Sequence, residues 1–183
     1  MTAPIIILLN GPGGAGKTTV SKLLAEKFDT CAVVDADIVR HMIVTGFIDP
    51  FLKEGIEQYM LGMHNTAQLA RNFYDAGLNV IIDGGATRKE YLDIYYKTLG
   101  DAYLVNVLLL PSKDSLVGRD AERTGKSKLG EAGISWLHDR FSTWKQTETR
   151  WTILDNTELT PAKTAEAILA IATTKLTTRE DAK

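Results

Sequence analysis

The sequence predicts an α/β domain in which a parallel, doubly wound sheet of five strands carries helices on both faces. Short apolar, β-branched runs alternate with helical patterns along the chain, as in domains built from βαβ units. Runs this short and this continuously apolar are typical of buried parallel strands. They lie at residues 5–9, 32–34, 80–82, 104–110 and 151–154.

The helical patterns fall between these runs, which is the alternation that the fold class requires. Pro161 after Thr160 suits the first position of a helix, and Asp37 is expected to cap a helix that starts at Ile38. Helices are predicted for residues 18–28, 52–76, 89–97, 112–123 and 161–175.

Length and composition predict the domain boundaries. A chain of 183 residues fits one domain that buries roughly two thirds of its unfolded surface, so we predict a single domain over residues 1–176. Residues 124–133 are rich in glycine and lysine and have little apolar content, which predicts the mobile part of a small helical lid at about residues 112–145. Residues 177–183 are polar and are predicted to form a frayed tail.

Composition also narrows the function classes. Charged residues make up 24% of the chain and its net charge is −2, so the overall field does not attract polyanions such as duplex nucleic acid or an anionic membrane. The single cysteine, Cys31, has no partner for an intrachain disulfide, which suits a reducing compartment. No apolar run is long enough to span a bilayer. We therefore expect a cytoplasmic protein with a small-molecule partner; nucleic acid is an unfavoured partner, and the oligomeric state stays open.

The strongest motif is a glycine-rich loop between the first predicted strand and the first predicted helix. Residues 11–18 read Gly-Pro-Gly-Gly-Ala-Gly-Lys-Thr, which satisfies the pattern G-x-x-x-x-G-K-[ST] in the strand–loop–helix context that the pattern requires. Backbone N–H groups of such a loop and the positive end of the helix cradle phosphate oxygens. ATP is the expected ligand, and the residues expected to bind it are Gly11, Gly13, Gly14, Ala15, Gly16, Lys17, Thr18 and Thr19.

Two side chains of this loop are expected to act on the phosphates directly. Lys17 is expected to reach the β- and γ-phosphates and to take part in catalysis, and the Thr18 hydroxyl is expected to ligate Mg²⁺. The loop by itself indicates nucleotide binding and leaves kinase, ATPase and GTPase open.

A second group of candidates follows the second predicted strand, at the edge where open α/β sheets bind ligands. Asp37 and Arg40 are three residues apart, so at the start of a helix they project on neighbouring faces. Asp37 is a candidate base for a hydroxyl proton, and Arg40 a candidate for holding an anionic group of the acceptor. The alternative is that Asp37 is only a helix cap and Arg40 only a surface charge.

Asp83 follows the third predicted strand and resembles a Walker B acid, which orients Mg²⁺ or contacts substrate. The two glycines after it allow a ligand to approach the backbone closely, and Arg88 is a candidate for supplying charge to the substrate. The alternative is that Asp83 only terminates a strand.

Arg119 and Arg123 are candidates for catalytic lid arginines. They are four residues apart on one helical face, directly before the predicted mobile segment, so closure of the lid would bring them over the phosphates. The alternative is a solvated charged face with Asp120 and Glu122 interleaved. His138 lies among aromatic and apolar residues and is expected to be packed rather than catalytic.

With these residues in this order, the chain resembles small P-loop kinases of the chloramphenicol phosphotransferase and zeta-toxin group over roughly residues 4–172. The D-x-x-R pattern of Asp37 and Arg40 is also similar to that of polynucleotide 5′-kinases. Residues 34–41 resemble the D-G-D-x-x-R-H segment of adenylylsulfate kinases, with Ala36 in place of its glycine. The resemblance implies a P-loop NTPase fold of the nucleoside-monophosphate-kinase type and a role for Asp37 as base toward a substrate hydroxyl.

The sequence thus predicts a kinase that uses ATP and Mg²⁺ to phosphorylate a hydroxyl of a small molecule. Two alternatives stay open. One is a kinase acting on a polynucleotide 5′-hydroxyl or a nucleotide sugar, and the other is an NTP-dependent switch in which nucleotide binding matters more than turnover.

Overall fold

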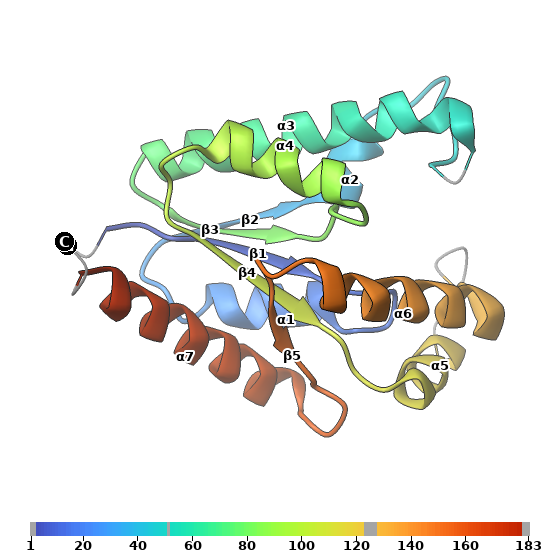
Figure 1. Ribbon diagram of the computed structural model, residues 1–183. Coiled ribbons are helices and arrows are strands. Elements are labelled where there is room, and N and C mark those ends of the chain that lie inside the picture. Colours follow the sequence, from blue (N-terminus) through green and yellow to red (C-terminus); the bar gives the residue numbers. More distant parts are fainter. Residues whose placement is uncertain (1–2, 51, 123–127, 181–183) are drawn as a thin grey trace. The chain divides into compact units, whose positions relative to one another are not determined.

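The computed structural model describes residues 3–50, 52–122 and 128–180. A five-stranded sheet has the strand order β2-β3-β1-β4-β5 (Figure 1). Each strand overlaps one of the predicted apolar runs, so the predicted parallel α/β fold is confirmed. The strands are β1 (Ile6–Asn10), β2 (Cys31–Asp35), β3 (Asn79–Asp83), β4 (Leu104–Leu109) and β5 (Thr152–Leu154).

All five predicted helical segments contain a helix. These are α1 (Lys17–Ala25), α3 (Ile56–Asp75), α4 (Lys89–Leu99), α5 (Lys113–Ala121) and α7 (Pro161–Glu180). Two further helices, α2 (Ala36–Arg40) and α6 (Gly130–Thr147), and a 3-10 turn, η1 (Lys53–Gly55), are also present. α7 continues to Glu180, so the backbone of the predicted tail is helical from residue 177 to residue 180.

The chain forms two compact units. The first consists of Met1–Leu8 and Ala25–Val105, and the second of Leu9–Leu24 and Asn106–Lys183. The predicted phosphate loop belongs to the second unit, whereas Asp37, Arg40, Asp83 and Arg88 belong to the first. The expectation of one domain over residues 1–176 stays a prediction.

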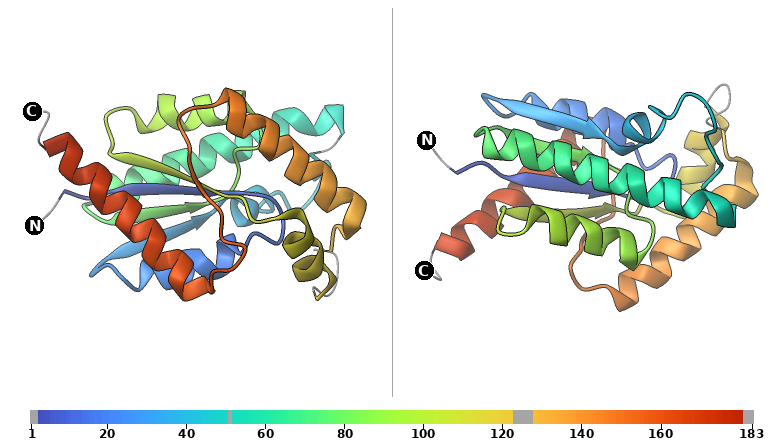
Figure 2. Two further views of the ribbon diagram at one scale, coloured as in Figure 1. Left: turned by 60° about the horizontal axis from the view of Figure 1, so that its bottom comes forward. Right: turned by 90° about the horizontal axis from the view of Figure 1, so that it is seen from above.

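In the first unit, α3 packs against strands β2 and β3 and against helices α2 and α4. Figures 1 and 2 show α3 and α4 side by side. β2 and β3 are parallel neighbours, and their register runs from Cys31 beside Asn79 to Asp35 beside Asp83. The buried residues of α3 recur every three or four positions, which gives the helix one continuous face for the core. They are Tyr59, Gly62, Met63, Thr66, Ala67 and Ala70.

In the second unit, β4 and β5 are parallel and pair Val107 with Thr152 and Leu109 with Leu154. α5 packs against α6. α7 begins at Pro161 as predicted, and the Thr160 hydroxyl accepts a hydrogen bond from the N–H of Lys163, which caps the helix.

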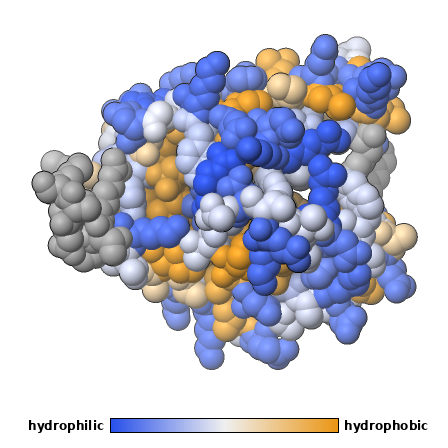
Figure 3. Space-filling model, in the orientation of Figure 1, coloured by the Kyte–Doolittle hydropathy of each residue, from blue (hydrophilic) through white to orange (hydrophobic). Residues whose placement is uncertain are grey.

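The surface in Figure 3 is mainly hydrophilic, and apolar residues appear on it in small groups. Single exposed apolar side chains of this kind are ordinary on protein surfaces. Within the described ranges, no helix combines the length and the apolar character that a membrane span needs.

Candidate active site

The predicted phosphate loop connects β1 to α1 and has a backbone that only glycine adopts readily. Gly11, Gly14 and Gly16 have φ angles of +149°, +85° and +90°. The loop closes on itself through the N–H of Ala15, which donates to the carbonyl of Pro12 at 3.2 Å. α1 follows directly, and its first intrahelical bond runs from the N–H of Val20 to the carbonyl of Gly16. The first N–H groups of α1 therefore point toward the loop.

Gly11 is required for a second reason, because its neighbour leaves no room for a side chain. A Cβ at this position would lie 2.3 Å from the carbonyl oxygen of Leu109 in β4. Gly14 is less tightly enclosed, with the carbonyl oxygen of Leu116 at 3.3 Å from a Cβ built there. The loop thus lies against β4 and α5 at van der Waals distance.

Lys17 folds back over the loop. Its Nζ donates to the carbonyl of Gly11 at 2.8 Å and to that of Pro12 at 3.2 Å. Thr18 and Thr19 are exposed in the first turn of α1. A cation therefore lies against the loop backbone, and two exposed threonines follow it in the first turn of the helix, which is an arrangement suited to binding phosphate oxygens.

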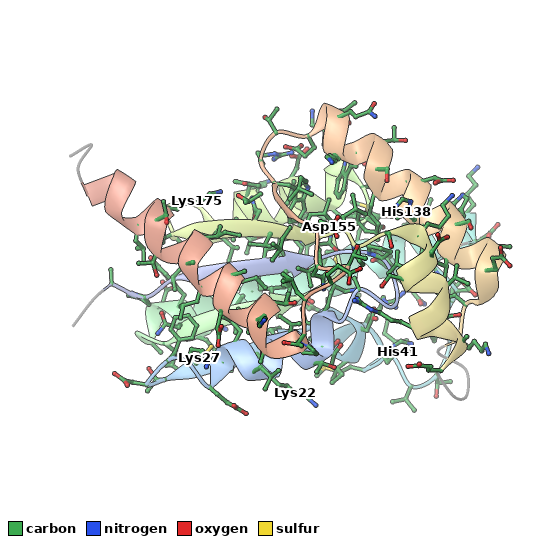
Figure 4. The ribbon with its side chains drawn as sticks, turned by 90° about the horizontal axis from the view of Figure 1, so that it is seen from below. Lys22, Lys27, His41, His138, Asp155 and Lys175 are labelled. Atoms are coloured by element: carbon green, nitrogen blue, oxygen red, sulfur yellow. The ribbon has the colours of Figure 1, made fainter. Side chains whose placement is uncertain are left out.

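The turn after β5 supports this loop. Asn156 is 3% exposed, and its Nδ2 donates to the carbonyl of Ala15 at 3.0 Å. Asp155, labelled in Figure 4, accepts from the N–H and the hydroxyl of Thr157 at 2.9 and 2.6 Å. These two bonds hold the pKa of Asp155 below its usual range. Sequence reasoning did not select Asn156.

Arg119, one of the two predicted lid arginines, lies on α5 beside this turn. Its Nη2 donates to the carbonyls of Asn156 and Thr157, each at 3.1 Å. The other, Arg123, lies outside the described residues.

The predicted lid range holds α5 and α6, and Asp120 ties the two together. This carboxylate is 2% exposed and accepts from the N–H groups of Leu129 and Gly130. Residues 130–133, predicted as part of the mobile segment, form the start of α6, where the buried carboxylate accepts from the first N–H groups of the helix. The alternative interpretation of this helix, a solvated charged face that includes Asp120, is therefore wrong for Asp120.

His41 and His138 are both labelled in Figure 4. His138 lies on α6 with a side chain that is 20% exposed, close to Asp139, which forms an ion pair with Lys113 at 2.9 Å. The mainly buried position of His138 agrees with the expectation that this residue is packed.

In the first unit, the prediction that Asp37 caps a helix is wrong. α2 begins at Ala36, and its cap is Asp35, whose Oδ1 accepts from the N–H of Asp37 at 2.8 Å and from that of Ile38 at 3.1 Å. A cap must precede the first helical residue, and the helix starts two residues earlier than expected. The carboxylate of Asp37 is therefore not used for capping and has an exposed fraction of 73%.

Arg40 holds this carboxylate. Its Nη2 donates to Oδ1 of Asp37 at 2.8 Å, while its own side chain is only 11% exposed. Nε and Nη1 of Arg40 are buried and have no hydrogen-bond partner among the described residues. Gly62 of α3 permits this burial, since a Cβ there would come within 3.3 Å of the Arg40 side chain.

Aromatic rings from three segments lie against the two predicted acceptor-side arginines. The guanidinium carbon of Arg40 lies 4.8 Å from the ring centre of Tyr59 and 5.7 Å from that of Phe47. Tyr59 also contacts Tyr91 at 4.7 Å, and Arg88 lies 5.9 Å from the Tyr91 ring. Each such cation–ring contact contributes about 0.5–2 kcal/mol, depending on its exposure to water. We call this set, Phe47, Arg40, Tyr59, Tyr91 and Arg88, the ring-and-cation ladder.

Asp83 ends β3 and is 5% exposed, in register with the capping residue Asp35 of β2. The backbone after it is fixed by two tyrosine hydroxyls, since Tyr59 donates to the carbonyl of Gly85 at 3.0 Å and Tyr95 to that of Gly84 at 3.4 Å. Burial raises the pKa of the Tyr59 hydroxyl to about 12. Through Tyr59 and Tyr91, the first unit thus joins Asp37, Arg40 and Arg88, all three predicted to contact the acceptor, in one contact network.

The comparison with known families identifies the chain more closely. A family model, AAA_33, described as an AAA domain, matches residues 6–144, which include the phosphate loop, Asp37 and Asp83. The chain belongs to this family. No curated protein shows a significant sequence match to the chain.

Solved structures similar to this AAA domain show its fold. A gluconokinase from Sinorhizobium meliloti 1021 has a TM-score of 0.70 at 17% identity, covering 100% of this chain and 99% of its own. Shikimate kinase from Acinetobacter baumannii in complex with shikimate has a TM-score of 0.68 at 21% identity, covering 95% of both chains. A tunicamycin resistance protein from Deinococcus radiodurans has a TM-score of 0.67 at 16% identity, covering 91% of this chain and 94% of its own. The AAA domain described here therefore has the fold of small P-loop kinases.

Proposed function

We propose that this chain is an ATP-dependent kinase that transfers the γ-phosphoryl group to a hydroxyl of a small-molecule acceptor. The observation that carries the proposal is the state of Asp37, whose carboxylate is exposed, free of a capping role and bound to Arg40. A nucleotide-dependent switch needs a phosphate loop but no exposed carboxylate held in this way. The fold of small P-loop kinases gives further support.

On the donor side, the loop N–H groups and Lys17 would bind the β- and γ-phosphates. Lys17 already lies over the loop, where its ammonium group donates to the carbonyls of Gly11 and Pro12 and would turn from them to phosphate oxygens. Arg119 would stabilise the charge on the transferred group, together with Arg123. Groups that are fixed before the reaction lower the barrier, because they need not reorganise as charge develops.

Mg²⁺ is implied by the fold, and the chemistry of the predicted ligands suits it, because Mg²⁺ prefers oxygen donors. The Thr18 hydroxyl and the Asp83 carboxylate would each supply an oxygen, and Mg²⁺ usually completes its shell with water and substrate phosphates. Once bound, the ion would offset the negative charge of the phosphate oxygens during transfer.

On the acceptor side, Asp37 would accept the proton of the attacking hydroxyl. Arg40 fixes the orientation of this carboxylate, and Arg88 and Asp83 would contact the remaining polar groups of the acceptor. Such positioning converts a bimolecular encounter into an oriented reaction of bound groups.

The test is ADP release from ATP and Mg²⁺ in the presence of hydroxyl compounds. The panel contains sugars, nucleosides, nucleotide sugars, aminoglycosides, chloramphenicol-like compounds, adenylylsulfate and 5′-hydroxyl oligonucleotides. Stimulation by one small-molecule class is expected. Stimulation by the oligonucleotides alone would make the chain a polynucleotide kinase, and no stimulation with ATP bound would favour the switch.

Asp37→Asn tests the role of the carboxylate. A general base contributes about 10²–10⁴-fold to a rate, so this variant is expected to lose at least about a hundredfold in kcat. The matched control is Asp75→Asn, because Asp75 is also an exposed helical aspartate paired with an arginine, Arg71, at 2.9 Å. Full transfer activity in Asp37→Asn would show that another group accepts the proton.

A further inference from the structure

The buried side-chain amide of Asn156 joins the phosphate loop to the turn that follows β5. Nδ2 of Asn156 donates to the carbonyl of Ala15 at 3.0 Å, across 141 residues of sequence. The acceptor settles which way this amide points, because a carbonyl oxygen accepts hydrogen bonds and cannot donate them. Oδ1 of Asn156 is buried and has no donor among the described residues, so this amide carries the free-energy cost of an unsatisfied polar atom beside its one bond to Ala15.

The bond to Ala15 controls a neighbouring N–H group. The peptide that joins Ala15 to Gly16 is planar and trans, so its C=O and N–H groups point in opposite directions. A carbonyl fixed on the Asn156 side therefore directs the N–H of Gly16 away from Asn156. Gly16 has a φ of +90°, and backbone of this kind lets successive N–H groups of a loop face a single anion.

Asn156 is itself held in place from the lid helix. Nη2 of Arg119 donates to the carbonyls of Asn156 and Thr157, and the hydroxyl of Thr157 accepts from the N–H of Ser112 at 2.7 Å. The turn is thus bonded to the start and the end of α5, and its amide side chain reaches the loop. This gives Arg119 a structural connection to the phosphate loop in addition to its own charge.

We propose that Asn156 is a positioning residue of the phosphate site, which aims the Gly16 N–H at bound phosphate by holding the Ala15 carbonyl, with Arg119 fixing the turn. This proposal rests on the phosphate site of the proposed function but not on the identity of the acceptor. It concerns the phosphates of the nucleotide rather than its base.

The experiment compares Asn156→Leu with Asn106→Leu by calorimetric titration of ATP and of inorganic tripolyphosphate, which carries phosphates alone. Asn106 is a matched control, since it is 2% exposed and its Nδ2 donates to a backbone carbonyl, that of Arg150, at 3.3 Å. A hydrogen bond to a charged group contributes enough free energy that misalignment of the bond from the Gly16 N–H to phosphate should weaken binding about tenfold. Asn156→Leu is expected to lose about this factor for both ligands, and Asn106→Leu to bind both as the wild type does.

Further readouts separate positioning from general destabilisation. Melting temperatures of both variants show whether each is folded, and Asn156→Asp, which keeps the shape but removes the donor, replaces Asn156→Leu if that variant does not fold. In the kinase assay, KM for ATP should rise while KM for the acceptor is unchanged. Wild-type affinity for tripolyphosphate in a folded Asn156 variant, or equal losses in the two asparagine variants, would overturn the proposal. Failure of the wild type to bind either ligand would overturn the phosphate site itself, whereas binding without transfer would overturn only the kinase.

Discussion

Gly11→Ala is expected to destabilise the protein more than alanine does at a glycine where the backbone conformation is the only obstacle to a side chain. Gly11 has a positive φ, and a Cβ there would also lie 2.3 Å from the carbonyl oxygen of Leu109. Gly77 provides the comparison, since its φ is +86° and a Cβ there would meet nothing within 4 Å. Both variants carry the conformational cost, and only Gly11→Ala carries the clash.

The magnitudes follow from these two contributions. A residue with a Cβ in the left-handed region costs about 1–2 kcal/mol, which applies to both variants. Forcing an extra methyl group into a packed site costs about 1–3 kcal/mol more, and the carbonyl oxygen in a central strand cannot move aside as a flexible side chain would. In a protein of this size, 1 kcal/mol shifts the melting temperature by roughly 2–4 °C. Gly11→Ala should therefore melt roughly 2–12 °C below Gly77→Ala.

Thermal unfolding followed by circular dichroism measures this difference, and titration with ATP shows whether the loop still binds. Gly11→Ala should bind ATP more weakly, because relief of the clash displaces the loop. Equal melting temperatures for the two variants would refute the reasoning, since the contact with Leu109 would then carry no cost.

Three other predictions concern single groups. The unfolding free energy should fall as pH rises from about 10 toward about 12, because the buried hydroxyl of Tyr59 keeps its proton in the folded chain while an unfolded tyrosine ionises near pH 10. Urea unfolding at a series of pH values measures this slope, which Tyr59→Phe should reduce. Asp120→Ala should lower the unfolding free energy by about 1–3 kcal/mol and speed hydrogen exchange at the amides of Leu129 and Gly130, because these amides lose their acceptor. Unchanged exchange at the two amides would contradict the role of Asp120 as their acceptor. Burial raises the pKa of Cys31 to about 11, so its alkylation at pH 8 should be about 100-fold slower than that of a free thiol and should become fast in urea.

The fold was predictable because each strand overlaps a short apolar run that can be recognised in the sequence. The runs at residues 5–9 and 80–82 became β1 and β3, each within one residue at either end. The phosphate loop was predictable for a different reason, since its glycines and lysine are consecutive and its flanking elements can be recognised locally. In both cases the signal lies within about ten residues of sequence.

The capping of α2 and the burial of Asp120 could not be predicted in this way. Asp35 and Asp37 are equally good capping residues by type, and only the point where β2 ends decides between them. The buried carboxylate of Asp120 accepts from N–H groups nine and ten residues further along the chain, which is beyond any helical spacing. Asn156 and Tyr59 act on parts of the chain that are 141 and 26 residues away, so their roles depend on the fold rather than on local pattern.

The ring-and-cation ladder constrains how this protein can change during evolution. Arg40 and Arg88 each lie against a tyrosine, and the two tyrosines touch each other. A mutation that removes one arginine leaves an aromatic face without its cation, and a mutation that removes one tyrosine ring takes a cation–ring contact from the arginine beside it. New acceptor preferences should therefore arise through paired substitutions, at positions 40 and 59 or at positions 88 and 91, in descendants of this sequence.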